Sequence, residues 1–106
     1  MIDEKIKDIL SRREQAHPED YFMIENLWEE EVEVLSSDIE ETIDYMKSRC
    51  SSSEFIWLSE VFEEVAEKTQ SRDFVNCLYT VAEKYPVEAK EYSIISFIDS
   101  ARDMIQ

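Results

Sequence analysis

Closely spaced carboxylates are the residues of this sequence whose arrangement best suits acid–base chemistry. The clearest group recurs at intervals of three and four, on neighbouring turns of a helix: Glu60, Glu63, Glu64 and Glu67. Two carboxyl groups can act as acid and base when they are buried and coupled. The apolar residues of this segment, Phe55, Leu58 and Val65, fall on the opposite face, so we expect the glutamates to lie in water. The spacing therefore favours a solvated helix face over a catalytic pair.

Other side chains that could carry chemistry lack partners at a useful spacing. His17 is the only histidine, and Cys50 and Cys77 are far apart, so a zinc site made of His and Cys is not expected. The serines at 51–53 have no neighbouring base that could activate them. Glycine is absent, which excludes phosphate-binding loops, dinucleotide-binding turns and EF-hand loops. We expect no enzyme, no metal and no cofactor.

The charge balance narrows the class of partner. The chain has 26 acidic against 11 basic residues and a net charge of −15, which argues against nucleic acid and anionic membranes as direct partners. No apolar run is long enough to span a bilayer. The start of the chain, "MIDEKIKDIL", lacks the pattern of a signal peptide, so we expect a cytoplasmic protein with reduced Cys50 and Cys77.

The segment "LWEEEVEVLSSDIEET", residues 27–42, contains seven carboxylates and no lysine or arginine. Helical proteins usually place Glu and Lys four residues apart, and this segment has no such pair. Its charges could simply solvate a helix face, or a positively charged partner could compensate them on binding. We expect the second, with an acidic contact patch formed by Glu29, Glu30, Glu31, Glu33, Asp38 and Glu41. Trp57 lies off the core face of its helix beside carboxylates, which predicts a second candidate patch of Trp57, Glu60 and Glu64.

The hydrophobic pattern predicts an all-α fold, with about six helices packed as antiparallel helical hairpins in one compact bundle. A chain of 106 residues with 43% hydrophobic residues can form one domain, 1–106, and the lack of glycine disfavours tight β-turns. Apolar residues recur at three and four positions in six segments. The expected helices cover 2–15, a segment beginning near Pro18, a segment within 36–50, and then 54–69, 72–85 and 87–104.

Local signals refine these helices. Ser37 and Ser51 have capping-box spacing to a glutamate three residues later, and Ser71 is expected to cap the fifth helix. The short alternation Val32–Val34 suggests an irregular stretch in the second helix. The last helix is apolar over a wide arc, so we expect it to be buried on more than one side; its apolar residues are Tyr92, Ile94, Ile95, Phe97, Ile98, Ala101 and Met104.

The segment "SEFIWLSEVFEEVAEKTQSRDFVNCLYTVAEKYP", residues 53–86, resembles small helical immunity proteins of bacterial toxin systems, including contact-dependent growth inhibition and other polymorphic toxins. The acidic segment upstream, "LWEEEVEVLSSDIEETIDYM", is similar to the same type of chain. The resemblance implies a cytosolic antidote that binds one cognate toxin domain tightly. Such toxins are often nucleases with basic substrate grooves, and an acidic surface would imitate phosphate charge there.

Two other classes of function fit the sequence. A phage-encoded or regulatory nucleic-acid mimic would use the same charges against a different host target. A helical adaptor or oligomerising subunit would instead present an exposed apolar face and self-associate. A charge of −15 on each chain disfavours self-association, so we expect a monomer in the free state.

Overall fold

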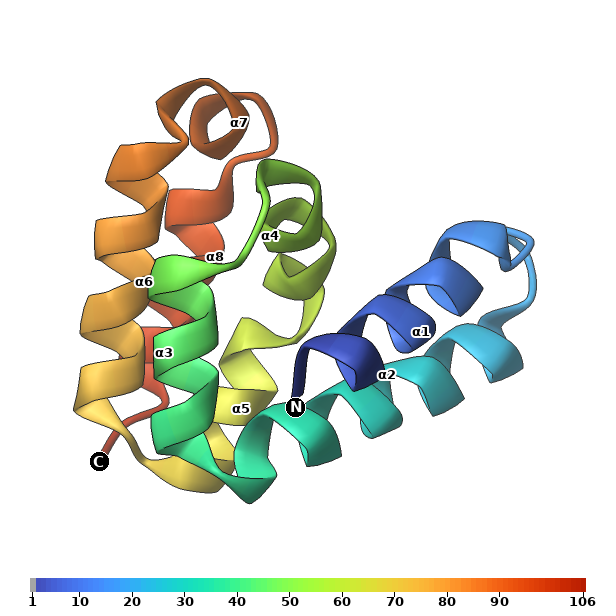
Figure 1. The fold of residues 1–106 in the computed structure, drawn as a ribbon, viewed down its shortest axis with the longest axis horizontal. Helices are drawn as coiled ribbons and strands as arrows, with labels where there is room; N and C mark the ends of the chain where they lie inside the picture. Colours follow the sequence, from blue (N-terminus) through green and yellow to red (C-terminus); the bar gives the residue numbers. More distant parts are fainter. Residues whose placement is uncertain (1) are drawn as a thin grey trace.

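Helices account for all the regular secondary structure in the computed structural model, which describes residues 2–106. The all-α prediction is therefore confirmed (Figure 1). Eight α-helices and one 3₁₀ helix follow one another within this range. In chain order they are α1 (Ile2–Gln15), α2 (Tyr21–Ser37), α3 (Ile39–Ser48), α4 (Ser52–Leu58), η1 (Ser59–Val61), α5 (Phe62–Thr69), α6 (Arg72–Lys84), α7 (Pro86–Glu91) and α8 (Ile94–Asp103).

The main core lies among α3 to α8, with the first part of α1 against it. Its centre is a chain of aromatic rings in which Phe62 lies 5.6 Å from Phe55 and 6.3 Å from Phe74, measured between ring centroids. The predicted apolar faces of 54–69 and 72–85 are buried here, apart from a half-buried Tyr85. The Tyr85 hydroxyl donates to the carbonyl of Cys50 at 2.6 Å and so joins the end of α6 to the turn before α4.

Helices α1 and α2 form an antiparallel hairpin whose connecting loop projects away from the rest of the molecule (Figure 1). The hairpin has a small apolar cluster of its own, separate from the main core: Ile9, Ala16, Ile24 and Leu27. Beyond this cluster the tip leaves Tyr21 and Phe22 exposed, at 70% and 77% of their surface. The tip of the hairpin thus presents aromatic side chains to solvent.

Two predicted helices are each divided in the structure. The helix predicted at 54–69 is interrupted by η1, where the hydroxyl of Ser59 donates to the carbonyl of Ile56 at 2.5 Å and competes with regular α-helical bonding. The helix predicted at 87–104 breaks between α7 and α8 because Ser93 adopts a left-handed conformation with φ of 54°. Neither break has the glycine signal by which such a turn is usually recognised.

The expected burial of the last helix on more than one side is wrong. Only one side of α8 packs into the core, through Ile94, Ile98 and Ala101. Met104 is half-buried against the same core, whereas Tyr92, Ile95 and Phe97 face outward with exposed fractions of 50%, 43% and 45%.

The predicted caps are partly confirmed. Ser51 forms the capping box with Glu54, and Ser71 caps α6 by accepting from the amide of Phe74. The box predicted at Ser37 is wrong, because α2 continues through Ser37 and Asp38 caps α3 instead. The irregular stretch predicted at Val32–Val34 is also wrong, since α2 is continuous there. Among the helices of residues 2–106, none combines the length and apolarity needed to cross a bilayer.

Candidate functional site

Three consecutive glutamates on α2 have three different environments, because successive residues of a helix point about 100° apart. Glu29 is exposed to solvent on the side that faces α5. Glu30 points toward α1, where its carboxylate accepts from the guanidinium of Arg12 at 2.9 Å. Glu31 points into the protein and is only 2% exposed. The acidic run is therefore not one continuous surface.

The charge of Glu30 is largely used inside the hairpin. Arg12 lies between two carboxylates and contacts Asp8 at 3.0 Å and Glu30 at 2.9 Å. Both contacts are solvent-exposed, so each is worth well under about 1 kcal/mol. Glu30 nevertheless presents a neutralised pair to an incoming partner.

Glu31 is a correction to the predicted contact patch. Both of its carboxylate oxygens are buried and have no hydrogen-bond partner among the residues that the structure describes. Burial is the main cause that raises the pKa of Glu31 to about 8, and repulsion from Glu60 adds to it while the charge of Arg13 opposes it. A carboxyl group in this position is mostly protonated at neutral pH and cannot contact a partner.

The second predicted patch is also tied to the interior. Arg13 of α1 binds Glu60 of η1 through two parallel hydrogen bonds of 3.0 and 2.8 Å. The indole N–H of Trp28 on α2 donates to the same carboxylate at 3.2 Å. The guanidinium of Arg13 stacks 5.0 Å from the ring centre of Trp57, which is half-buried against the main core. Arg13, Trp28, Trp57 and Glu60 thus form a junction that joins the hairpin to the body.

Asp38 and Glu41 have structural roles at the other end of α2. The Asp38 carboxylate accepts from the amide of Glu41 at 3.2 Å and caps α3. The Glu41 carboxylate accepts from the backbone amide of Ile2 at 3.0 Å. Both side chains are therefore oriented by contacts within the chain.

The other carboxylates of the two predicted patches, Glu29, Glu33 and Glu64, border one groove between α2 and α5, which we call the α2–α5 groove. It has a volume of about 440 Å³ and is lined by Glu25, Trp28, Glu29, Val32, Glu33, Glu64 and Lys68. Within residues 2–106, the four glutamates of this groove form no hydrogen bond or ion pair with another side chain. The half-buried Trp28 and Val32 provide apolar surface among them. Such a surface can bind a group that is both cationic and apolar.

The sequence prediction includes Glu29, Glu33 and Glu64 of this groove but misses Glu25 and Lys68. Glu25 precedes the acidic run, which begins at Leu27, so counting charges within the run leaves it out. The helical period would have found it, because residues 25, 29 and 33 are each four apart and share one face.

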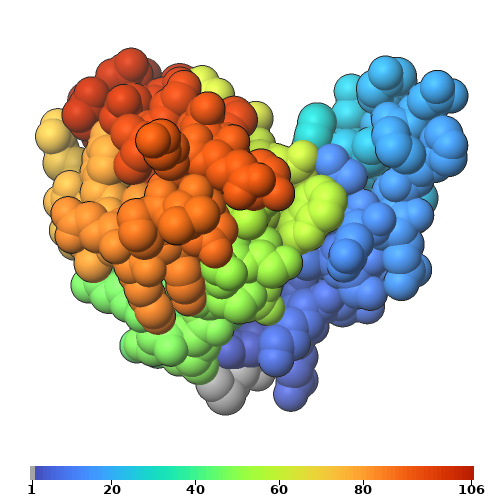
Figure 2. Space-filling view, turned by 90° about the horizontal axis from the view of Figure 1, so that it is seen from above, coloured from blue at the N-terminus to red at the C-terminus, as the bar shows by residue number. Residues whose placement is uncertain are grey.

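Two other hollows lie outside the α2–α5 groove. Figure 2 shows a notch between the α1–α2 hairpin and the part of the molecule that contains α7 and α8. A hollow of about 510 Å³ here is bordered by the half-buried Ile56 and Trp57 and by the exposed Tyr92 and Phe97. Its one acidic lining residue, Glu60, is already paired with Arg13.

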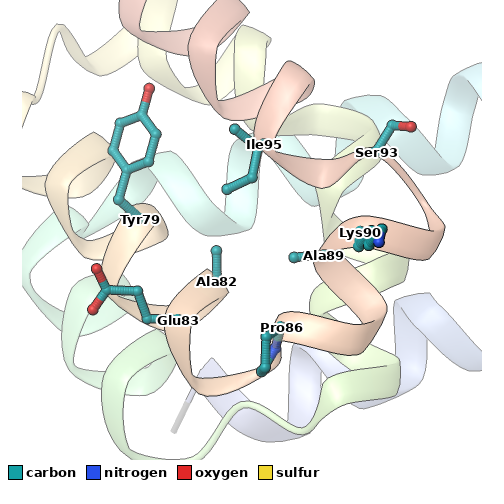
Figure 3. Close-up of a pocket in the computed structure, with 8 residues that line it drawn as sticks. All are labelled: Tyr79, Ala82, Glu83, Pro86, Ala89, Lys90, Ser93 and Ile95. Carbon is teal, nitrogen blue, oxygen red and sulfur yellow. The ribbon is translucent and has the colours of Figure 1, made fainter.

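The third hollow, of about 490 Å³, lies among α6, α7 and α8. Ala82, Ala89 and Ile95 point into it, and the carboxylate of Glu83 points away (Figure 3). At its edge the hydroxyl of Tyr79 donates to Asp99, and burial and this carboxylate both raise the pKa of Tyr79. The lining offers apolar contact and no paired acid and base.

The remaining reactive side chains lie apart from these surfaces. Cys50 and Cys77 are buried free thiols, and burial raises their pKa values to about 12 and about 11, which makes them poor nucleophiles at neutral pH. His17 lies in the loop of the hairpin, and its Nδ1 accepts from the amide of Glu19 at 3.1 Å. Over the described part of the chain, no three His, Cys, Asp or Glu side chains are arranged to hold a metal ion.

Comparisons of the chain with protein-family models, with curated proteins and with solved structures found no match.

Proposed function

We propose that this protein is an inhibitory binding protein, specifically an immunity protein that neutralises a cognate bacterial toxin domain in the cytoplasm. The observation that supports this proposal is the α2–α5 groove, where four glutamates, Glu25, Glu29, Glu33 and Glu64, have no cation of residues 2–106 within hydrogen-bond range. The role is binding rather than catalysis, and no metal or cofactor takes part in it.

The energetics of the groove fit a charged partner. Like charges four residues apart on a helix repel each other, so Glu25, Glu29 and Glu33 weaken the free protein slightly. A basic surface would relieve this repulsion on binding, and the negative potential would speed the encounter at low salt. A nuclease toxin has such a surface, because its substrate groove must attract phosphate. The proposed mechanism is occupation of that groove, or of the surface next to it.

The experiment is co-expression of the chain with the toxin domain encoded beside its gene, followed by affinity measurement on the purified complex. We expect Glu29→Lys with Glu33→Lys to slow association and weaken binding about a hundredfold, since two favourable contacts become repulsive. Glu14→Lys with Glu91→Lys makes the same change in net charge at exposed positions outside the groove, and we expect a much smaller effect. A toxin domain that neither binds the wild-type chain nor is inhibited by it would refute the proposal.

A second candidate, the adaptor or oligomerising subunit, is favoured by the exposed apolar residues. Tyr21 and Phe22 at the hairpin tip and Tyr92 and Phe97 beside the notch are all at least 45% exposed. If these surfaces pair between copies of the chain, sizing chromatography at high protein concentration will show a dimer. A monomer at all concentrations will favour the immunity function.

A further inference from the structure

We propose that the α2–α5 groove binds an amphipathic helix of the partner, with lysine or arginine at four-residue intervals and an apolar residue beside them. This inference rests on the proposed function and names the element of the toxin that the groove would recognise. Its basis is the geometry of the groove, where charge and apolar surface alternate at helical spacing.

The acidic side of the groove has the period of a helix. Glu25, Glu29 and Glu33 follow one another at four-residue steps, so neighbouring members lie about 6 Å apart along α2. Lysines or arginines at four-residue steps on a second helix repeat at the same distance. Glu64 on α5 lies on the far side of the groove and would contact the same helix from there. A helix lying along α2 would therefore meet a carboxylate at each of its basic turns.

The apolar part of the groove is rigid before the partner arrives. Trp28 is half-buried, and its N–H is fixed by Glu60, so little side-chain freedom remains to be lost on binding. Val32 lies one turn further along α2 and packs on the main core. A groove of about 440 Å³ has room for apolar side chains from one face of a helix. An aliphatic or aromatic residue between the basic positions would fill it.

The charge of the groove selects the chemistry of the occupant. Four carboxylates repel phosphate, which excludes nucleic acid, and an anionic lipid surface is excluded for the same reason. Among the described residues that line the groove, Lys68 is the one cation. It would repel a basic helix at one place and so moderates the affinity of the site.

The experiment uses the full-length chain and a fluorescent 15-residue helical peptide made of leucine and lysine, with lysines at four-residue intervals along one face. We expect Glu29→Gln, Glu33→Gln and Glu64→Gln together to weaken binding of this peptide about thirtyfold. The matched control changes three exposed glutamates outside the groove, Glu14, Glu83 and Glu91, to glutamine, and we expect less than about a threefold loss. Replacing the leucines that flank the lysines by serine in the peptide should weaken binding about tenfold.

Lys68 supplies an independent check in the opposite direction. We expect Lys68→Gln to tighten binding of the leucine–lysine peptide about threefold, because it removes the repulsive charge at the groove. Every substituted residue is exposed, so we expect the fold to be retained in all the variants. Circular dichroism of each variant checks this.

The outcomes separate this inference from the proposed function. Equal loss of peptide binding in the groove variant and in the control would show attraction by net charge alone and would overturn the groove site. If the toxin domain binds the wild-type chain and the groove variant equally well, the groove is overturned while the immunity function stands. If no toxin domain binds the chain at all, the immunity function fails, and the peptide measurements still decide whether the groove takes a basic helix.

Discussion

Replacing Glu31 by glutamine tests how the burial of its carboxyl group affects the stability of the protein. Among the described residues, this carboxyl group has no hydrogen-bond partner. The folded state holds the pKa of Glu31 at about 8, against an ordinary value of 4.5. The folded protein therefore binds this proton more tightly than the unfolded chain does. The stabilising contribution is complete below pH 4.5, decreases as the pH rises, and is lost near pH 8. Glutamine has nearly the same shape and stays neutral throughout, so Glu31→Gln removes this dependence.

The size of the effect follows from the two pKa values. With a folded value of about 8 and an unfolded value of 4.5, the contribution of Glu31 to the free energy of unfolding falls by about 3 kcal/mol between pH 5 and pH 8. Small domains have a total stability of about 5–15 kcal/mol, so this change is easily measured. Desolvation is its main cause, and the facing pair of Arg13 and Glu60 modifies it in opposite directions.

The assay is urea unfolding of the wild-type chain and of Glu31→Gln at several pH values from 5 to 8. The two proteins differ at this side chain alone, so the difference between their pH profiles reports the effect of Glu31. We expect the variant to gain about 3 kcal/mol relative to the wild type across this range. Parallel curves would refute the reasoning, as would a carbon-13 titration of the Glu31 carboxyl with a midpoint near 4.5.

Three further predictions concern the fold. Ser93→Gly should stabilise the protein by about 0.5–1 kcal/mol, because glycine accepts the left-handed conformation at no steric cost. The control Ser96→Gly, inside α8, should destabilise the protein by about 0.5 kcal/mol. Urea unfolding measures both changes, and the same sign for both would contradict the explanation. Arg13→Met should lower the free energy of unfolding by about 1–2 kcal/mol in the same assay, because it removes the ion-pair partner of the half-buried Glu60 carboxylate. A change of a few tenths of a kcal/mol would show that the junction contributes little to stability. Cys50 and Cys77 should react with a thiol reagent at neutral pH only on unfolding; rapid labelling of the native protein would disprove their burial.

The helices could be predicted because their apolar residues recur at three and four positions over long stretches. The breaks at Ser59 and Ser93 could not, because both are made by serines in a chain that has no glycine to mark such turns. The exposure of Tyr92 and Phe97 could not be predicted either, because the apolar pattern does not show which arc of the last helix meets the core.

The site shows a similar division. Glu29 and Glu33 were predicted as contact residues and do border the α2–α5 groove, where a partner could reach them. The position of Glu31 could have been read from the period, because it lies four residues after Leu27 and four before Leu35, both of which are buried. Counting charges along the chain treats neighbours alike, and the rotation of the helix separates them. Ion pairs with residues far along the chain, such as Arg13 with Glu60, leave no signal of this kind.

Within residues 2–106, two residues adopt the left-handed conformation, Gln70 and Ser93, and replacing them by glycine would have different effects. Gln70 ends α5 with φ of 54°, and its side-chain amide donates to the carbonyl of Met104 at 3.0 Å while its oxygen accepts from the amide of Gln106 at 2.8 Å. Glycine there would relax the backbone and release the segment that follows α8. Helix α8 would then fray from its carboxyl end, which these two hydrogen bonds hold against the end of α5. A residue with a strained backbone can thus stabilise a protein more than glycine would, when its side chain also joins two distant segments of the chain.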